Sequence, residues 1–246
     1  MLTRMSSLVA ALVLAISSIA LLGAAPANAD ACYTWDRTLR SGSSGSDVAE
    51  LQERVAGWAG YGVNMAIDGS YGPQTTQAVK NFQAAYGLSA DGVAGPNTFA
   101  QIHALQDADC SPLHFSWAEV DGGCGAGGYS GGSVSATTVR TNLLRSMWRA
   151  EALRHRMGDK PVRVTSGFRS QSCDRAVGGS GTGQHTYGRA IDIVPVNGNN
   201  TFCNMARTAR YIGYGAIFGP GYPGHNDHVH VDIRSGRTWS APSCGI

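Results

Sequence analysis

A short motif that occurs twice constrains the N-terminal part of the chain more than any other feature. Residues 68–75 (DGSYGPQT) and 91–98 (DGVAGPNT) share Asp-Gly, two variable residues, Gly-Pro, one variable residue and Thr. Asp-Gly is typical of a tight turn, and proline is favoured in the first turn of a helix. Each copy therefore predicts a turn followed by the start of a helix.

Apolar residues at helical spacing follow each copy of the motif. They are Val79, Phe82 and Tyr86 after the first copy, and Phe99, Ile102 and Leu105 after the second. An earlier run has the same spacing, with Val48, Leu51, Val55 and Trp58. The sequence therefore predicts a compact three-helix bundle within residues 30–109.

The first 29 residues have the pattern of a secretory signal peptide. Arg4 precedes a long apolar run, and residues 27–29 (ANA) offer small side chains to a signal peptidase. The mature chain would then begin at Asp30. An uncleaved membrane anchor is the alternative, and no later segment is apolar enough to span a bilayer. We expect the protein to be exported.

The cysteines and the charges narrow the class further. All six cysteines lie in the predicted mature part and none forms a C-x-x-C pair, so in an oxidising compartment we expect three disulfides. Six cysteines allow 15 pairings, and spacing alone does not choose among them. Charged residues make up 15% of the chain, the net charge is +2, and basic runs are absent. Nucleic acid is therefore excluded as an expected partner.

Residues 110–246 alternate between helical and extended patterns. We expect a helix from Ser135 or Thr137 to about Met157, a helix over 204–214, and strands over 161–167, 189–196 and 228–234. Residues 122–133 are rich in glycine and serine and predict an irregular entry to this domain. The predicted fold class is α+β, with the bundle preceding a domain built on a small antiparallel sheet.

Polar side chains interrupt two of the predicted strands. His228, His230 and Asp232 alternate with valines, and Asp192 lies between two isoleucines. A single polar residue in such a strand is most often solvated, but two strands that present histidine and aspartate together indicate a site. His185 precedes Asp192 by a turn that contains Gly188. His185, Asp192 and His230 thus form a set of two imidazoles and one carboxylate, which is typical of a catalytic zinc site.

These segments resemble two known families. Residues 39–99, with the doubled motif, resemble the three-helix peptidoglycan-binding domain found beside bacterial cell-wall hydrolases. QHTYGRAID (184–192), DHVH (227–230) and SGFRS (166–170) are similar to the motifs of the zinc D,D-peptidases, and the domain order resembles that of secreted actinomycete zinc D-alanyl-D-alanine carboxypeptidases. Gly183 stands where many relatives have serine, which affects the loop and not a metal ligand. The resemblance also implies disulfides 32–110, 124–173 and 203–244.

The second resemblance implies a role for each motif residue. His185, Asp192 and His230 would hold one zinc ion, and Asp227 would be the general base. Arg169 would bind the C-terminal carboxylate of a peptide, because its planar fork matches a carboxylate. His228 would donate to the oxyanion or assist the leaving amine. No motif role falls to His225, which we expect at the rim, or to Asp232, which we expect to orient a neighbour.

The resemblance implies a monomeric enzyme that is secreted to the extracellular space or the cell wall. It would bind peptidoglycan, with no membrane contact once the signal peptide is cleaved, and would release D-alanine from the D-Ala-D-Ala end of the stem peptide. Two alternatives stay open at this point. One is a zinc endopeptidase that cuts internal D,D or L,D cross-link bonds, and the other is a catalytically dead wall-binding protein. Arg169 and Asp227, respectively, argue against them.

Overall fold

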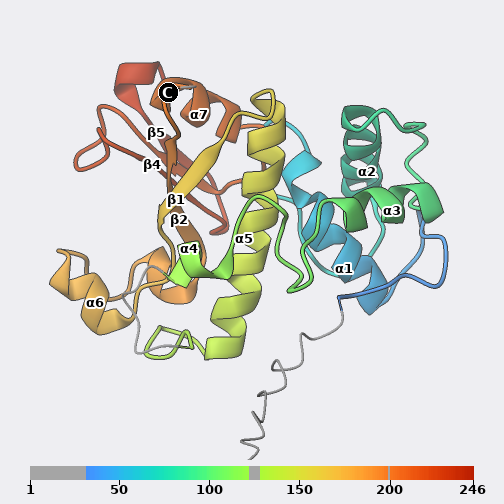
Figure 1. Cartoon of the computed structure of the whole chain (residues 1–246), viewed down its shortest axis with the longest axis horizontal. Helices are drawn as coiled ribbons and strands as arrows, with labels where there is room; N and C mark the ends of the chain where they lie inside the picture. Colours follow the sequence, from blue (N-terminus) through green and yellow to red (C-terminus); the bar gives the residue numbers. More distant parts are fainter. Residues whose placement is uncertain (1–31, 122–127, 199) are drawn as a thin grey trace, which may run out of the picture.

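The computed structural model describes residues 32–121, 128–198 and 200–246, which form a helical bundle packed against a sheet domain (Figure 1). The predicted α+β class, with a helical domain followed by a domain with a small sheet, is confirmed. The predicted signal peptide lies outside the described residues. Within those residues, no helix is both long enough and apolar enough to cross a membrane.

The bundle contains the helices that the repeated motif predicts. They are α1 (Ser46–Val55) with the short 3-10 helix η1 (Ala56–Trp58), α2 (Pro73–Ala85) and α3 (Pro96–Ala104). α2 and α3 each begin at the proline of the motif, where a missing N–H costs no helical hydrogen bond. Leu51, Val79, Phe82 and Ile102 are buried between the helices.

One buried glutamine organises each copy of the motif. Gln52 donates from Nε2 to the Asp68 carboxylate and to the Thr75 hydroxyl, both at 3.0 Å. Gln83 makes the equivalent bonds in the second copy, at 3.0 Å to the aspartate and 3.1 Å to the threonine. Each glutamine thus holds the turn of its copy of the motif, which explains why the two copies have the same spacing. The sequence pattern did not point to either glutamine.

The sheet has five strands in the order β1-β2-β4-β3-β5. Their bounds are β1 (Val162–Ser166), β2 (Ala190–Pro195), β3 (Ala216–Phe218), β4 (Val229–Asp232) and β5 (Thr238–Ser240). The first three pairings across the sheet are antiparallel, as predicted, whereas β5 adds to β3 in the parallel direction. The three predicted strands correspond to β1, β2 and β4, and β3 and β5 were not predicted.

Helices surround this sheet. They are α4 (Trp117–Asp121), α5 (Ala136–Arg156), α6 (Gln171–Ala176), α7 (Phe202–Ala209) and the 3-10 helices η2 (Gln184–Tyr187) and η3 (Pro242–Cys244). Ser135 caps α5 by accepting the Thr138 N–H at 3.2 Å, in agreement with the sequence. The helix predicted over 204–214 is shorter than expected, because the chain leaves the helix after Ala209 and turns toward β3.

α5 lies between the bundle and the sheet and contacts both (Figure 1). Arg145 of α5 forms a salt bridge of 2.8 Å with Glu53 of α1, and the His155 ring stacks on Tyr86 with centroids 4.4 Å apart. The two domains therefore pack directly against each other. Two of the three expected disulfides, Cys32–Cys110 and Cys203–Cys244, are confirmed. The third involves Cys124, which lies outside the described residues.

Candidate metal centre

The sheet register places two of the predicted metal ligands opposite each other. Asp192 of β2 pairs with His230 of β4 across the antiparallel ladder, so both side chains project from the same face of the sheet. His185 reaches them from η2, which ends at Gly188 in the left-handed region, with φ of 67°. A side chain at Gly188 would also meet the Val139 carbonyl oxygen at 2.6 Å, so this turn requires glycine.

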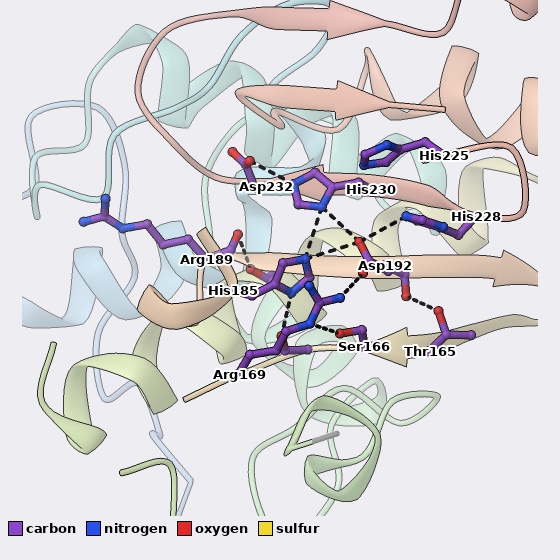
Figure 2. A network of polar contacts seen from close by, with 12 residues as sticks. Thr165, Ser166, Arg169, His185, Arg189, Asp192, His225, His228, His230 and Asp232 are labelled. Atoms are coloured by element: carbon purple, nitrogen blue, oxygen red, sulfur yellow. Dashed lines mark hydrogen bonds and ion pairs between the residues drawn. The ribbon is translucent and has the colours of Figure 1, made fainter. Parts of the chain in front are cut away.

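The three candidate metal-ligand atoms converge in a buried position (Figure 2). His185 Nε2 lies 3.2 Å from His230 Nδ1 and 3.4 Å from Asp192 Oδ1, and His230 Nδ1 lies 2.9 Å from the same oxygen. Ligands at the usual zinc distances in a tetrahedral site lie roughly 3.3 Å apart. The spacing of these three atoms therefore matches the three protein corners of such a site.

The outer contacts of both histidines fix which nitrogen faces the centre. His185 Nδ1 lies 2.7 Å from the Gly167 carbonyl oxygen, which only accepts, so Nδ1 carries the proton and Nε2 offers a lone pair. His230 Nε2 lies 3.1 Å from Asp232 Oδ2, so its Nδ1 offers a lone pair to the centre in the same way. Three acceptor atoms therefore face one another, and a cation is the group that satisfies all three.

The charges around the centre also favour a cation. Burial alone raises the pKa of Asp192, but the neighbouring imidazoles of His185 and His230 hold that pKa well below the usual range. Burial lowers the pKa of His230, yet Asp192 and Asp232 outweigh this effect and raise it. The pocket thus stabilises positive charge at the point where the lone pairs meet, and the residues present fit a divalent metal such as zinc.

The second oxygen of Asp192 has a different partner. Arg169 donates from Nη2 to Asp192 Oδ2 at 2.8 Å and from Nε to the Ser166 hydroxyl at 2.9 Å (Figure 2). Its Nη1 lies 3.6 Å from the carboxylate of Asp174. Arg169 therefore holds Asp192 so that Oδ1 faces the centre. The sequence placed Arg169 at the substrate and gave no indication of this contact with a predicted metal ligand.

Asp227 and His228 lie beside the centre as a hydrogen-bonded pair. His228 Nδ1 is 2.8 Å from Asp227 Oδ1, and His228 Nε2 is 3.8 Å from Asp192 Oδ1. The Asp227 side chain is 89% exposed, whereas that of His228 is 21% exposed. The hydrogen bond from His228 lowers the pKa of Asp227, which therefore remains an ionised acceptor. Of the two, His228 lies nearer to the three candidate metal-ligand atoms.

The centre opens into a cavity of about 730 Å³ that brings in residues without a predicted role. The His225 ring lies 4.8 Å from the His228 ring and 5.8 Å from the His230 ring, between centroids (Figure 2). Burial lowers the pKa of His225, which favours its neutral form. Arg234 also lines the cavity and grips Asp232 with Nε at 2.8 Å. No sequence motif marks Arg234, although its position two residues after Asp232 places both on one side of the chain.

Comparisons with known proteins divide the chain in the same way as the fold. Residues 114–232 match the family model described as Peptidase M15, and residues 44–102 match that of a putative peptidoglycan binding domain. The zinc D-Ala-D-Ala carboxypeptidase of Streptomyces albus G is 54% identical over 217 residues, which cover 88% of this chain and 84% of that protein. The chain belongs to the peptidase M15 family.

Two further proteins are similar to shorter parts of the chain. An N-acetylmuramoyl-L-alanine amidase of Bacillus licheniformis, CwlL, is 45% identical over 65 residues, which are 25% of this M15 peptidase and 18% of the amidase. A crystal structure of a peptidoglycan-binding protein from Clostridioides difficile is 40% identical over 26% of this chain and 39% of that protein, with a TM-score of 0.24. Each of these two proteins resembles only about a quarter of the M15 peptidase.

Proposed function

We propose that this M15 peptidase hydrolyses the terminal D-Ala-D-Ala bond of peptidoglycan stem peptides, with one zinc ion held by His185, Asp192 and His230. One observation carries the proposal: two ring nitrogens and a carboxylate oxygen, all buried, converge within 4.8 Å of one another. The 54% identity to the zinc D-Ala-D-Ala carboxypeptidase of Streptomyces albus G supports the choice of reaction and of metal.

The proposed mechanism assigns proton transfer to residues at the edge of the cavity. Zinc in such a site polarises a carbonyl and acidifies water. Asp227 accepts the proton of the attacking water at its carboxylate, because hydrogen bonding to His228 keeps that group ionised. His228 presents Nε2 to the cavity, where it donates to the developing oxyanion or to the leaving amine.

Arg169 has the position and the free donors to bind the carboxylate of the substrate. Its side chain lines the cavity and is 22% exposed. Hydrogen bonds to Ser166 and Asp192 occupy Nε and one hydrogen of Nη2. Nη1 lies 3.6 Å from Asp174, beyond hydrogen-bond distance, so its hydrogens and the second Nη2 hydrogen remain for a ligand. Arg169 would thus hold Asp192 with one part of its fork and the terminal carboxylate with the other.

A pair of stem peptides tests the proposed reaction. With zinc present, the protein is expected to release D-alanine from a peptide that ends in D-Ala-D-Ala, and to act at least about 100-fold more slowly on the same peptide with a C-terminal amide. The amide lacks the anion that Arg169 recognises, and loss of hydrogen bonds to a charged group costs about 1.5–3 kcal/mol. Chromatographic quantification of released D-alanine and D-alaninamide measures both rates.

The two alternatives give different results in the same assay. Equal rates on the acid and the amide, together with cleavage of purified cross-linked muropeptides, would replace the proposal by a zinc endopeptidase. Failure to cleave any of these substrates, with one zinc ion bound per chain, would identify a catalytically dead wall-binding protein.

The helical domain would attach the enzyme to its substrate. The match of residues 44–102 to a peptidoglycan-binding model supports this role, which we propose for a domain that spans residues 30–109, followed by a catalytic domain over 110–246. A secreted monomer that acts outside the cell or in the wall would need no further partner than peptidoglycan.

Asp232 is expected to strengthen zinc binding without touching the ion. It is fully buried and holds His230 Nε2 at 3.1 Å, so it orients the ring and makes Nδ1 a better donor. Asp232→Asn is therefore expected to weaken zinc binding by about 10- to 100-fold. Competition with a chromophoric chelator measures this affinity independently of activity. The control is Asp174→Asn, another buried carboxylate that contacts neither histidine ligand; equal zinc affinity in the Asp232 variant and in this control would contradict the assignment.

A further inference from the structure

A cluster of arginines and aromatic rings lies where the two domains meet, outside the site described above. We call it the seam cluster: Tyr61, Arg156, Arg207, Arg210, Tyr211, Arg237 and Trp239. Tyr61 follows η1 in the bundle, whereas the other members belong to the sheet domain. Two hydrogen bonds to the backbone of Gly62 join the two sides. The Gly62 N–H donates to the Arg210 carbonyl oxygen at 2.8 Å, and the side chain of Arg237 donates from Nη2 to the Gly62 carbonyl oxygen at 2.9 Å. The domain packing therefore fixes the cluster.

The rings of the seam cluster contact one another, and each of them also contacts a guanidinium group. The Tyr61 ring lies 5.0 Å from Tyr211 and 5.7 Å from Trp239, between centroids. Each ring carries an arginine at its face: Arg156 at 5.3 Å from Tyr211, Arg210 at 5.7 Å from Tyr61 and Arg237 at 4.8 Å from Trp239. Stacking holds each guanidinium in place and leaves its N–H edge available to an anion.

The positive charges of the seam cluster have no negative partners within the described part of the chain. None of its four arginines forms a salt bridge there, and their hydrogen bonds go to backbone carbonyl groups. Tyr61 and Tyr211 are 52% and 39% exposed, so two adjacent rings of the cluster face the solvent. Exposed rings among unpaired cations are typical of a surface that binds an anionic partner.

A cavity within the cluster indicates the kind of anion. Arg156, Arg207 and Arg210 line a space of about 330 Å³ together with Thr208 and Tyr211. One guanidinium already satisfies one carboxylate through its bidentate fork, whereas a phosphate group offers more acceptor oxygens and accommodates several guanidinium groups. Arg237 and Trp239 do not line this cavity, so the cluster offers a further cation and a further ring beyond it.

We propose that the seam cluster binds a phosphate-bearing anionic polymer of the cell wall, with a phosphodiester group in the cavity and the polymer backbone along the aromatic rings. This binding does not depend on the proposed peptidase reaction. These arginines form no basic run in the sequence, since the fold gathers them from the end of α5, the end of α7 and the segment before β5. A second contact with the wall would act alongside the helical domain.

Sedimentation of the full chain with purified bacterial cell walls tests the proposal. The test variant is Arg156→Gln/Arg210→Gln, and the matched control is Arg140→Gln/Arg163→Gln. Arg140 is also an exposed arginine stacked on an aromatic ring, 4.0 Å from Trp117, and it lies outside the cluster. On walls that retain their phosphodiester polymers, the test variant is expected to bind about tenfold more weakly than the wild-type protein. Its affinity should also depend less steeply on salt, since fewer counterions are released.

Three comparisons decide the outcome. On walls stripped of phosphodiester polymers by acid, the test variant and the wild-type protein are expected to bind alike, and soluble poly(glycerol phosphate) is expected to compete only with intact walls. Equal losses in the test and control variants would overturn the proposal, as would a loss that persists on stripped walls, which would place carboxylates of peptidoglycan in the cavity. Binding confined to anionic lipid vesicles would overturn it too. An unchanged melting temperature and unchanged hydrolysis of a soluble peptide show that the variant is folded.

Discussion

Replacement of Asp192 by asparagine is expected to abolish stoichiometric zinc binding and, with it, peptidase activity. The two oxygens of Asp192 serve different partners: Oδ1 faces His185 and His230, and Oδ2 accepts from Arg169 at 2.8 Å. An asparagine side chain has one acceptor and one donor, so it turns an N–H₂ group either toward the lone pairs of the histidines or toward the guanidinium. With the N–H₂ group toward the guanidinium, two hydrogen-bond donors face each other. With the N–H₂ group toward the histidines, the metal ion loses its carboxylate ligand.

The size of the loss follows from the role of the residue. Substitution of a partner that only orients a ligand costs about 10- to 100-fold in metal affinity, so loss of the ligand itself is expected to exceed 100-fold. Zinc content after dialysis, measured by atomic absorption, and the rate of D-alanine release are expected to fall together. Chelation of the wild-type protein is expected to remove the same activity, and added zinc to restore it.

Asp174→Asn provides the matched control for this substitution. Asp174 also contacts Arg169, at 3.6 Å from Nη1, and its side chain is slightly more buried than that of Asp192, at 4% against 7% exposed. It contacts none of the three candidate metal-ligand atoms, so the variant is expected to retain zinc even though the charge near Arg169 has changed. If Asp192→Asn kept the zinc affinity of the wild-type protein, the ligand set would be wrong. If both variants lost zinc equally, Arg169 and not Asp192 would account for the effect.

The candidate ligands could be predicted because a strand alternates its side chains. Asp192 and His230 interrupt apolar strands with the correct phase, and a turn at Gly188 returns His185 to the same point. The elements that the sequence did not reveal are those that depend on distant partners. β3 and β5 have three residues each, too few for a period to appear, and they exist because β4 and β3 supply their hydrogen bonds.

The residues of the site were easier to predict than the contacts that their side chains make. A motif placed Arg169 near the substrate, but only the register of β1 against β2 brings its guanidinium to Asp192. His225 was expected at the rim, and its ring packs against His228 and His230 because of the turn over residues 222–225. Such contacts depend on tertiary packing, which the local sequence pattern does not encode.

Replacement of Asp227 by asparagine is the second substitution with a large expected effect, and it separates catalysis from metal binding. The variant is expected to retain zinc, because the Asp227 side chain is 89% exposed and its described partner is His228. Loss of a positioned general base is expected to lower kcat by about 10²- to 10⁴-fold. Steady-state rates of D-alanine release, together with the zinc content of the same samples, measure the two properties.

Asn226→Ala is the control for the conformation of the loop. Asn226 accepts the Gly221 N–H at 2.8 Å, so this substitution removes a loop hydrogen bond without removing a group that transfers protons. If the effect of Asp227→Asn arose from a disordered loop, the control would lose kcat to the same extent. A wild-type kcat for Asp227→Asn would contradict any role of this carboxylate in catalysis.

The geometry allows Asp227 to act directly or through His228, and a double substitution distinguishes these routes. If Asp227 orients His228 and the imidazole accepts the proton, then His228→Gln, Asp227→Asn and the double variant are expected to lose similar factors in kcat, because the pair acts as a unit. If Asp227 accepts the proton itself, the losses are expected to multiply and His228→Gln to be the milder change. The mechanism proposed above, in which Asp227 is the general base, corresponds to the second pattern. His228 Nε2 lies 3.8 Å from Asp192 Oδ1, which suits the role of a donor to the oxyanion or the leaving amine.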